Sequence, residues 1–324
     1  MINLTDSETQ FALDSVRKAT HLAQTIQQDL VTPAFLKKDR TPVTVGDYAI
    51  QAIVAEALTK AFPDDPLVAE ESSTALTSSE GQSTLEQVHR FVSRVLPNTT
   101  PKSICQWIDR GTADTASRFW TLDPIDGTKG FLRQAHYAIV LALVVDGQCQ
   151  IGAMGCPSLN GGSFFIAVRE QGAWMSHMDS PEQFKQITVS QQKDLNAAKV
   201  LSSFEFSHTN SKQLDILIDT LGAEAKLIRM DSQTKHVVLA SGEGDLLVRL
   251  LSTTQPEYRE KIWDQIAGAL LIEEAGGSIT DLNGKALDFS TGRTLSNNRG
   301  LVASNGYLHE EVLELIGRIR TGNE

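Results

Sequence analysis

The stretch Trp120-Thr-Leu-Asp123-Pro-Ile-Asp126-Gly127-Thr128-Lys129-Gly130 joins an apolar run to two closely spaced carboxylates. Residues 119–122 are predicted to form a short strand. Because proline fixes its own φ and has no N–H donor, we expect that strand to end at a rigid corner at Asp123. Gly127 allows a positive φ or a close backbone approach, and Thr128 can begin a new turn with its hydroxyl available.

Asp123 and Asp126 are the first candidates for a metal site. Two carboxylates a few ångströms apart repel each other and shift each other's pKa values unless a cation lies between them. Mg²⁺ suits such a pair, because it takes oxygen ligands and keeps positions open for water or phosphate. Considered alone, these residues are also compatible with an ordinary Asp-Pro turn whose acids are solvated.

Length and charge limit the classes of function. With 324 residues, the chain is long enough for a large core and two domains. Its 41% hydrophobic and 21% charged residues are typical of a globular protein. The formal net charge of -11 argues against a nucleic-acid partner, which needs clustered Lys and Arg. A small phosphorylated substrate stays possible, since bound metal ions reverse the local field.

Cysteine usage and apolar runs bear on the location of the protein. Cys105, Cys149 and Cys156 form neither a metal-ligand pattern nor an even-numbered disulfide framework, which favours a reducing compartment. The first residues lack the features of a signal peptide, and the longest apolar run, residues 138–145, is too short to span a bilayer. We therefore expect a cytoplasmic protein without a membrane partner and, since no surface stripe favours a dimer, a monomer.

The first half of the chain is predicted to be α+β. A capping-box pattern at residues 5–8 begins a helix that reaches residue 30, and further helices are expected over residues 45–62 and 85–96. Two β-hairpins are expected, over residues 136–155 with a turn at Asp146-Gly147 and over residues 163–175 with a turn at Gln171-Gly172. Residues 32–44, 72–83 and 97–101 are predicted to be surface loops.

The second half alternates strand and helix, which is typical of an α/β layer. Strands are expected over residues 200–204, 226–230 and 246–250 and on either side of 283–300, and helices over 210–221, 232–241, 263–275 and 308–319. The polar segment 180–196 marks the predicted boundary between an N-terminal α+β domain (1–190) and a C-terminal α/β domain (191–324).

Three more acids extend the candidate metal site. Glu70 and Glu71 follow a short apolar run, and Asp264 is expected to open a helix directly after Trp263. Strand ends and helix starts are where open active sites gather in layered α/β structures, although each acid alone is more often structural. Together with Asp123 and Asp126, these residues could supply oxygen ligands to two or more Mg²⁺ ions.

Several motifs resemble those of the inositol monophosphatase superfamily of lithium-sensitive, magnesium-dependent phosphatases: Asp123-Pro-Ile-Asp126-Gly-Thr128, Trp263-Asp264-Gln-Ile-Ala-Gly268 and Glu274-Ala-Gly-Gly277. Other segments resemble its 3'(2'),5'-bisphosphate nucleotidase branch over nearly the whole chain: Thr41-Pro-Val-Thr44, Gly46-Asp-Tyr-Ala49, Phe62-Pro-Asp-Asp65, Glu70-Glu-Ser72, Gly127-Thr-Lys-Gly-Phe-Leu-Arg133, Met230-Asp-Ser-Gln233, Lys235, Glu260-Lys-Ile-Trp-Asp264 and Gly292-Arg-Thr294. Ala69 departs from the family, which usually has glycine there, but a methyl group removes no ligand. The resemblance implies a layered αβαβα sandwich of the sugar-phosphatase type, within the α+β / α/β class.

The same resemblance implies roles at the metal site. Metal ligands are expected to be the carboxylates of Glu70, Asp123, Asp126 and Asp264 and the main-chain carbonyl of Ile125, holding two to three Mg²⁺ ions. Asp47 and Thr128 are expected to orient and deprotonate the attacking water. From its position alone, Asp47 could equally be an acid that stabilises the first turn of a helix. Glu71 is expected near the ions without being a firm ligand.

Substrate contacts are expected from Gly127, Thr128, His208, Ser232, Lys235, Arg249 and Asp264. Ser232 and Lys235 are one helical turn apart and are expected to face the same way, so that with Arg249 they hold the phosphate that is not hydrolysed. Lys235 and Arg249 could instead be plain solvated charges. His208, where the motif match is loose, could instead be a surface histidine in a helix-capping loop.

By this resemblance, the small-molecule substrate is adenosine 3',5'-bisphosphate, which is converted to AMP and phosphate, with 3'-phosphoadenosine 5'-phosphosulfate as a further candidate. One rival interpretation is an inositol phosphate phosphatase of the same superfamily, which would not need Ser232, Lys235 and Arg249. The other is a non-catalytic phosphonucleotide-binding protein, although such a protein would tend to lose metal ligands that this sequence keeps.

Overall fold

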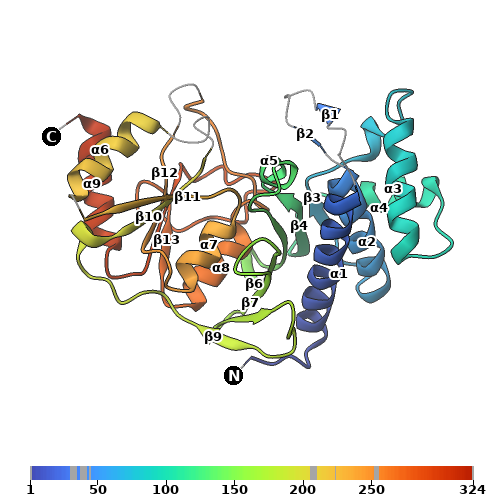
Figure 1. Cartoon of the computed structure of the whole chain (residues 1–324), viewed down its shortest axis with the longest axis horizontal. Helices are drawn as coiled ribbons and strands as arrows, with labels where there is room; N and C mark the ends of the chain where they lie inside the picture. Colours follow the sequence, from blue (N-terminus) through green and yellow to red (C-terminus); the bar gives the residue numbers. More distant parts are fainter. Residues whose placement is uncertain are drawn as a thin grey trace.

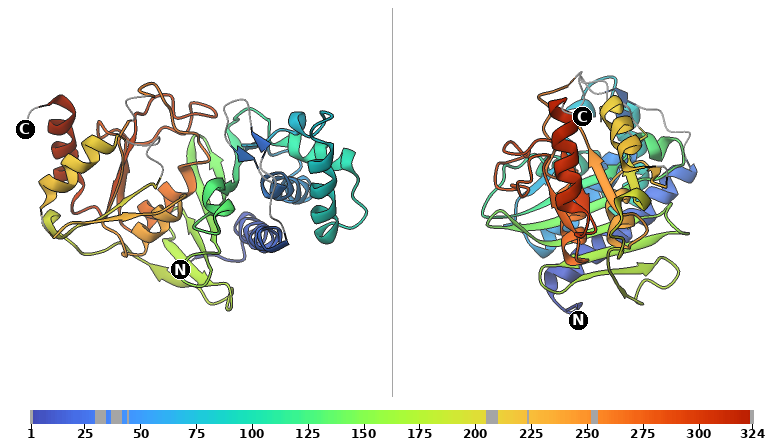
Figure 2. Two further views of the ribbon diagram at one scale, coloured as in Figure 1. Left: turned by 45° about the horizontal axis from the view of Figure 1, so that its top comes forward. Right: turned by 90° about the vertical axis from the view of Figure 1, so that its left-hand side faces the viewer.

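The computed structural model describes residues 2–29, 35–36, 42–43, 45–204, 210–222, 224–251 and 255–322. Within these ranges the chain forms five layers in the order helix, sheet, helix, sheet, helix (Figure 1). The predicted αβαβα sandwich is therefore confirmed. Figure 2 shows the layers from two further directions, and its right-hand view faces the outer helix α9 in red.

The first sheet has seven strands in the order β3-β4-β5-β6-β7-β8-β9. They are β3 (Leu67–Ala69), β4 (Arg118–Asp126), β5 (Ala138–Val145), β6 (Gln148–Cys156), β7 (Ser163–Val168), β8 (Ala173–His177) and β9 (Lys185–Ile187). β3 pairs in parallel with β4, and the remaining pairs are antiparallel, so both predicted hairpins are confirmed. Helices α1 (Ser7–Asp29) and α2 (Val45–Ala61) cover its outer face, and α3 (Gln82–Val95) and α4 (Pro101–Arg110) pack on α2 (Figure 1).

The second sheet has five strands in the order β11-β10-β12-β14-β13. They are β10 (Lys199–Ser202), β11 (Lys226–Arg229), β12 (Leu246–Arg249), β13 (Ser278–Thr280) and β14 (Leu301–Ser304). Helices α7 (Thr234–Ala240) and α8 (Ile266–Glu274) lie between the two sheets, whereas α6 (Ser211–Leu221) and α9 (His309–Thr321) form the outer layer. The smaller elements are β1 (Phe35–Leu36), β2 (Pro42–Val43), α5 (Thr128–Leu132), η1 (Ser73–Ala75) and η2 (Leu195–Ala197).

Helix α8 is apolar on every side because both of its faces are covered. Residues 266–272 are all buried, as expected for a helix enclosed by two sheets. On the side of the first sheet, Gly152 of β6 lies against α8, where a Cβ atom would come within 2.9 Å of the Ala267 Cα. The absence of a side chain at Gly152 therefore sets how closely the helix approaches the sheet.

Three local predictions need correction. β4 does not end at Asp123 but continues to Asp126, with an irregular register against β5 between these residues, so Pro124 bends the strand without ending it. Helix α8 begins at Ile266, so Asp264 lies in the turn before it. The first turn of α1 is bonded by the Asp6 carboxylate, which accepts the Thr9 N–H at 3.2 Å.

Helix α4 was not predicted, although its signal is present in the sequence. Thr100 is its N-cap, Pro101 occupies the first turn, and Thr100 and Ser103 form a reciprocal capping box. The proline and threonine content of residues 97–101 predicts a surface loop, but Thr100 and Pro101 begin the helix. Strand β9 likewise lies inside the polar segment 180–196.

The predicted boundary between residues 190 and 191 stays a prediction. It falls between β9 and η2, and one apolar cluster around α7 and α8 includes residues from both sides of it, among them Val140 and Leu247. Among the residues described, the structure has no helix that is both long and apolar enough to cross a membrane.

Replacing Gly152 with alanine is expected to lower the free energy of unfolding by about 1–3 kcal/mol, because the added methyl group meets the backbone of α8. Gly317 is a matched control: it lies inside α9, where a Cβ atom has no neighbour within 4 Å among the described residues. Gly317→Ala should stabilise by roughly 0.5–1 kcal/mol through helix propensity. Urea unfolding measures both, and equal effects would contradict the proposed close approach at Gly152.

Candidate active site

The parallel pairing of β3 and β4 brings Glu70 to Asp123. Ala69 of β3 is the register partner of Leu122 of β4, so the next residues along the two strands are Glu70 and Asp123. The carboxyl ends of parallel strands meet at the same edge of a sheet, where side chains from separate parts of the chain gather. Two predicted ligands that are more than fifty residues apart in the sequence thus lie at one edge.

Gly127 makes the turn that follows Asp126. It has φ 84° and ψ 45°, a left-handed conformation that favours glycine, and α5 begins directly after it at Thr128. A Cβ atom at Gly127 would lie 2.8 Å from the Ser232 Cβ, so the turn packs closely against the segment before α7. The Thr128 hydroxyl donates to the Ile125 carbonyl at 3.2 Å, which holds that carbonyl at the corner.

Asp123, Asp126 and Asp264 form an acidic cluster that could hold a metal ion. One carboxylate oxygen from each lies within 4.8 Å of the others. Asp123 is only 2% exposed, and burial, together with the nearby Glu70, Asp126, Asp264 and Asp47, raises its pKa well above the usual range. The structure therefore brings together all five of these acids, from β4, α2, the residue after β3 and the turn before α8.

The cluster has the oxygen ligand atoms that a hard divalent cation needs. Asp123 Oδ1 is buried and has no hydrogen-bond partner among the described residues, so this oxygen is available as a ligand atom. Burial and the repulsion of Asp126 and Glu70 raise the pKa of Asp264 well above its usual range. Carboxylate oxygens at this spacing fit Mg²⁺, Mn²⁺ or Ca²⁺ better than soft metals.

Asp126 accepts a hydrogen bond from a main-chain donor. The N–H of Gln233 donates to Asp126 Oδ2. Burial raises the pKa of Asp126 to about 6, and this N–H and the Lys235 ammonium oppose that shift. The corner in the first half of the chain is thus bonded directly to the segment that leads into α7.

Helix α2 supports the cluster from the outer layer. Asp47 lies in its first turn and is 1% exposed. One turn later, the Gln51 side chain accepts the Glu71 N–H at 2.9 Å and donates to the Glu71 and Ile108 carbonyls, both at 2.7 Å. Gln51 thereby fixes the backbone of the Glu70–Glu71 segment, a role for which its residue type gave no specific signal.

The prediction that Ser232 and Lys235 face the same way on a helix is wrong in its geometry. Ser232 lies before α7 with φ 65°, and the helix begins at Thr234. Lys235 instead reaches back, and its Nζ donates to the Ser232 carbonyl at 2.6 Å and to the Met230 carbonyl at 3.3 Å. Burial lowers the pKa of Lys235 to about 8, and Asp126 opposes that shift.

Arg249 lies at the end of β12 and is not a plain solvated charge. Its guanidinium pairs with Glu260 at 2.9 Å and lies 5.3 Å from the centroid of the Tyr258 ring. Burial opposes its charge, but Glu260 raises the pKa of Arg249 above its ordinary value. Arg249 also interacts electrostatically with Asp264 and Asp126, so it faces the acidic cluster. His208 lies outside the described residues.

Gln233 is a site residue to which the sequence gave no role. Besides its main-chain bond to Asp126, its side-chain Nε2 donates to the Trp263 carbonyl at 2.9 Å, directly before Asp264. One residue therefore ties two members of the acidic cluster together. The bond to Asp126 uses the main-chain N–H of Gln233, which any non-proline residue would supply. The residue type therefore gave no signal for this contact.

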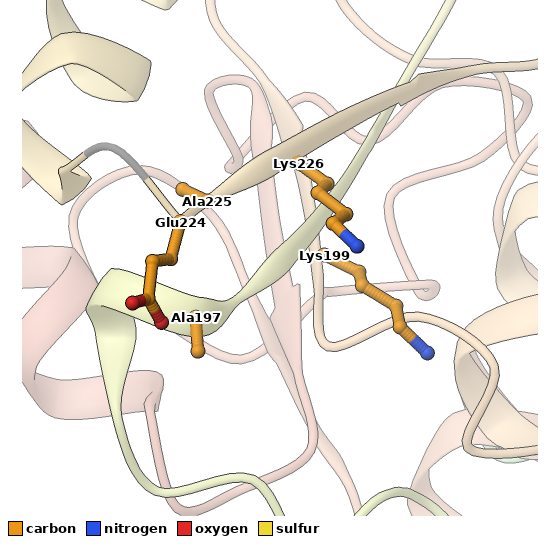
Figure 3. Close-up of a pocket in the computed structure, with 5 residues that line it drawn as sticks. All are labelled: Ala197, Lys199, Glu224, Ala225 and Lys226. Carbon is orange, nitrogen blue, oxygen red and sulfur yellow. The ribbon is translucent and has the colours of Figure 1, made fainter.

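A separate pocket of about 390 Å³ lies away from the acids (Figure 3). It is lined by Ala197, Lys199, Glu224, Ala225 and Lys226. These residues precede or begin β10 and β11, which run in parallel from there, and β11 then leads to Ser232 beside the Asp126 corner. The pocket therefore lies at the amino-terminal ends of β10 and β11, away from the strand ends that lead to the acids. Its lining residues include none of the predicted site residues.

The comparison with known proteins defines the class. The model of the inositol monophosphatase family matches residues 5–321, and the chain belongs to this family. A protein of Schizosaccharomyces pombe named 3'(2'),5'-bisphosphate nucleotidase is 37% identical, covering 95% of this chain and 94% of its own. A protein of the same name from Dictyostelium discoideum is 36% identical, covering 94% of this chain and 95% of its own. The predicted resemblance to that branch is confirmed.

The fold is also that of solved family members. A Thermotoga maritima IMPase superposes with a TM-score of 0.71, at 21% sequence identity, and covers 98% of this chain and 100% of its own. At this identity the likeness concerns the fold alone. It agrees with the five layers described above.

In the presence of a metal chelator, the free energy of unfolding is expected to fall as the pH rises through about 6. The folded pKa of Asp126 lies above the ordinary value of 3.8, so the folded state favours the protonated acid. That stabilisation is complete below about pH 4 and is lost as the pH passes about 6. Asp123 and Asp264 shift in the same direction.

Urea unfolding at a series of pH values in EDTA, with and without added Mg²⁺, measures this dependence. The difference between the wild type and Asp126→Asn isolates the contribution of Asp126, and Mg²⁺ should restore stability at neutral pH. In EDTA, the difference in unfolding free energy between the wild type and Asp126→Asn should fall as the pH rises to about 6. A difference that rises instead would contradict the repulsion among the buried acids.

Proposed function

We propose that the protein is a magnesium-dependent phosphatase that removes the 3'-phosphate of adenosine 3',5'-bisphosphate to give AMP and phosphate. The observation that carries the proposal is the convergence of Asp123, Asp126 and Asp264 within 4.8 Å, with Glu70 and Asp47 beside them. The names of the relatives that match nearly the whole chain support the same reaction.

The proposed metal ligands are the carboxylates of Glu70, Asp123, Asp126 and Asp264 and the Ile125 carbonyl, which together would hold two to three Mg²⁺ ions. Bound Mg²⁺ supplies a water of lowered pKa and neutralises charge on the phosphate and its leaving oxygen. The buried Asp123 oxygen that lacks a donor supports this assignment. A carbonyl oxygen has two lone pairs, so Ile125 can accept the Thr128 hydroxyl and also bind a cation.

Asp47 and Thr128 are proposed to handle the attacking water. Thr128 begins α5 immediately beside Asp126, and its hydroxyl can accept or donate a hydrogen bond to a water at the corner. Asp47 is buried and interacts electrostatically with Asp123 across the cluster, where it can take the proton of that water. Positioning and charge neutralisation then account for most of the rate.

The remaining phosphate of the substrate is proposed to bind to the cations beside the cluster. Lys235 and Arg249 both interact electrostatically with Asp126, and each is fixed by a neighbour, Lys235 by the Ser232 carbonyl and Arg249 by Glu260. Such preorganised donors suit a phosphate, which Arg binds through a fork and Lys as a point charge. Gly127, Ser232 and Asp264 are proposed to contact the substrate as well, which is supported by the close approach of Gly127 to Ser232 and by the electrostatic interaction of Asp264 with Arg249. His208 is assigned from the family resemblance alone.

The further expectations of the sequence remain proposals: 3'-phosphoadenosine 5'-phosphosulfate as an additional substrate, a monomeric state and a cytoplasmic location. The three cysteines are free thiols, and Cys149 and Cys156 are buried. Free thiols are typical of a reducing compartment, which supports that location.

The deciding assay measures phosphate release from adenosine 3',5'-bisphosphate with Mg²⁺ and with EDTA, and identifies the product as the 5'- or 3'-monophosphate. Inositol 1-phosphate is the comparison substrate. Turnover of the inositol phosphate without turnover of the nucleotide would refute the proposal. Tight nucleotide binding in calorimetry without hydrolysis would instead indicate a non-catalytic binding protein.

Asp126→Asn is expected to lower kcat on the order of a thousandfold or more, because it removes a charged ligand from the proposed metal site. Asp194→Asn is the control, since Asp194 is exposed and caps η2 through the Asn196 N–H at 2.9 Å. Steady-state kinetics at saturating Mg²⁺ compare the two. Wild-type activity in Asp126→Asn would exclude it as a metal ligand.

Lys235→Met is expected to raise KM for adenosine 3',5'-bisphosphate by about 10–100-fold, the loss typical of a hydrogen bond to a charged group. With adenosine 3'-monophosphate, which lacks the second phosphate, the change should be much smaller. Any damage to the neighbouring Asp126 would affect both substrates alike, so the ratio of the two effects isolates the phosphate contact. Equal losses with both substrates would remove Lys235 from the substrate site.

A further inference from the structure

The Arg293 side chain contacts both the segment that leads to Glu70 and the segment that leads to Asp264. It belongs to the loop between β13 and β14, and its side chain crosses to the first sheet. One terminal nitrogen, Nη2, donates to the Ala69 carbonyl, and the other, Nη1, donates to the carbonyls of Gly111 at 3.2 Å and Ala113 at 3.3 Å. A loop of the second half thereby holds the end of β3.

The same guanidinium contacts the segment that contains Asp264. Its central carbon lies 4.9 Å from the centroid of the Trp263 ring, within the range of a cation–π contact. The backbone is fixed as well, since the Ile262 N–H donates to the Arg293 carbonyl at 3.1 Å and Leu295 donates to Glu260 at 2.9 Å. Main-chain bonds at Arg293 and Leu295 therefore hold this loop beside the segment that contains Trp263.

Both contacts of Arg293 involve residues that directly precede a proposed metal ligand. Ala69 immediately precedes Glu70, and Trp263 immediately precedes Asp264. One side chain therefore binds the backbone directly before one proposed ligand and the ring directly before another, although the two come from opposite halves of the chain. Displacing the guanidinium would remove this direct link between the two segments.

We propose that Arg293 is a positioning residue that sets the separation of Glu70 and Asp264 and thereby the affinity of the acidic cluster for divalent metal ions. This inference rests on the proposed function, because it assumes that these two carboxylates bind metal. Neighbours that orient metal ligands typically change metal affinity by about 10–100-fold when they are removed. Arg293 is expected to act in this range without touching metal or substrate.

Arginine suits this position better than lysine. Its planar fork can donate to several carbonyls while its face stacks on an indole ring, whereas an ammonium group is a point charge. Burial lowers the pKa of Arg293, and the nearby Asp114 and Glu70 oppose that shift. The geometry of the fork, as well as its charge, should therefore matter at the Ala69 carbonyl.

Arg110 provides a matched control. Its guanidinium also donates to three main-chain carbonyls, those of Phe62 at 3.0 Å, Pro63 at 3.1 Å and Asp65 at 2.8 Å. These residues precede β3, at the end of the strand opposite Glu70. The Arg110 side chain therefore has the same bonding chemistry, but its carbonyl partners precede β3 whereas that of Arg293 directly precedes Glu70.

The test measures Mn²⁺ binding to the purified full-length chain by electron paramagnetic resonance of free Mn²⁺, and urea unfolding in EDTA. Arg293→Gln is expected to weaken Mn²⁺ binding by about 10–100-fold. Arg110→Gln should lower stability to a similar degree but leave Mn²⁺ affinity within about twofold of the wild type, because it does not reach the ligands. Equal Mn²⁺ affinities in Arg293→Gln and Arg110→Gln would overturn the inference.

Arg293→Lys separates geometry from charge and also decides the question if the glutamine variant does not fold. We expect the Mn²⁺ affinity of Arg293→Lys to be clearly below that of the wild type and no lower than that of Arg293→Gln. Wild-type affinity in the lysine variant would show that charge alone is needed and would overturn the positioning role. If the wild type itself binds no Mn²⁺, the proposed function falls together with this inference, whereas normal wild-type binding with no effect of Arg293 rejects the inference alone.

Discussion

The mutual repulsion of buried carboxylates at the acidic cluster is the constraint on which the rest of the structure depends. Burial and like-charge neighbours raise the pKa values of Asp123, Asp126 and Asp264, so holding them together in the charged state costs free energy unless cations lie nearby. The protein offsets part of this cost with Lys235, Arg249 and the Gln233 N–H. Because the repulsion is only partly offset, such an arrangement favours the binding of a divalent cation.

Main-chain bonds hold these acids in place against their repulsion. Gln51 fixes the segment of Glu70, Gln233 joins Asp126 to the carbonyl before Asp264, and Arg293 joins the residue before Glu70 to Trp263. Gln51 reaches from α2 to the end of β3, and the Gln233 N–H reaches from the segment before α7 to Asp126 of β4, so these two contacts run between different layers of the sandwich. The geometry of the cluster is therefore a property of how the layers are assembled, and the local sequence around each acid determines it only in part.

This division explains what the sequence could predict. Hairpins with Asp146-Gly147 and Gln171-Gly172 turns, and the left-handed Gly127 after two carboxylates, follow from local backbone preferences. The continuation of β4 through Pro124 was not predictable in this way, because its pairing with β5 across the irregular register supplies the compensation. Gln233 and Arg293 were missed as site residues because they bind largely through or to main-chain groups, which are the same for almost every residue type.

The packing of α8 connects the hydrophobic core to this chemistry. Gly152 lets the helix approach the first sheet at Ala267, three residues after Asp264, so the depth of that contact helps to set where the carboxylate lies. A bulkier residue at Gly152 is expected to push α8 away from the first sheet, and because close-packed interiors transmit such shifts, Asp264 is expected to move relative to Asp123. Core packing is therefore expected to affect the acidic cluster, since the proposed ligands belong to layers whose spacing the core determines.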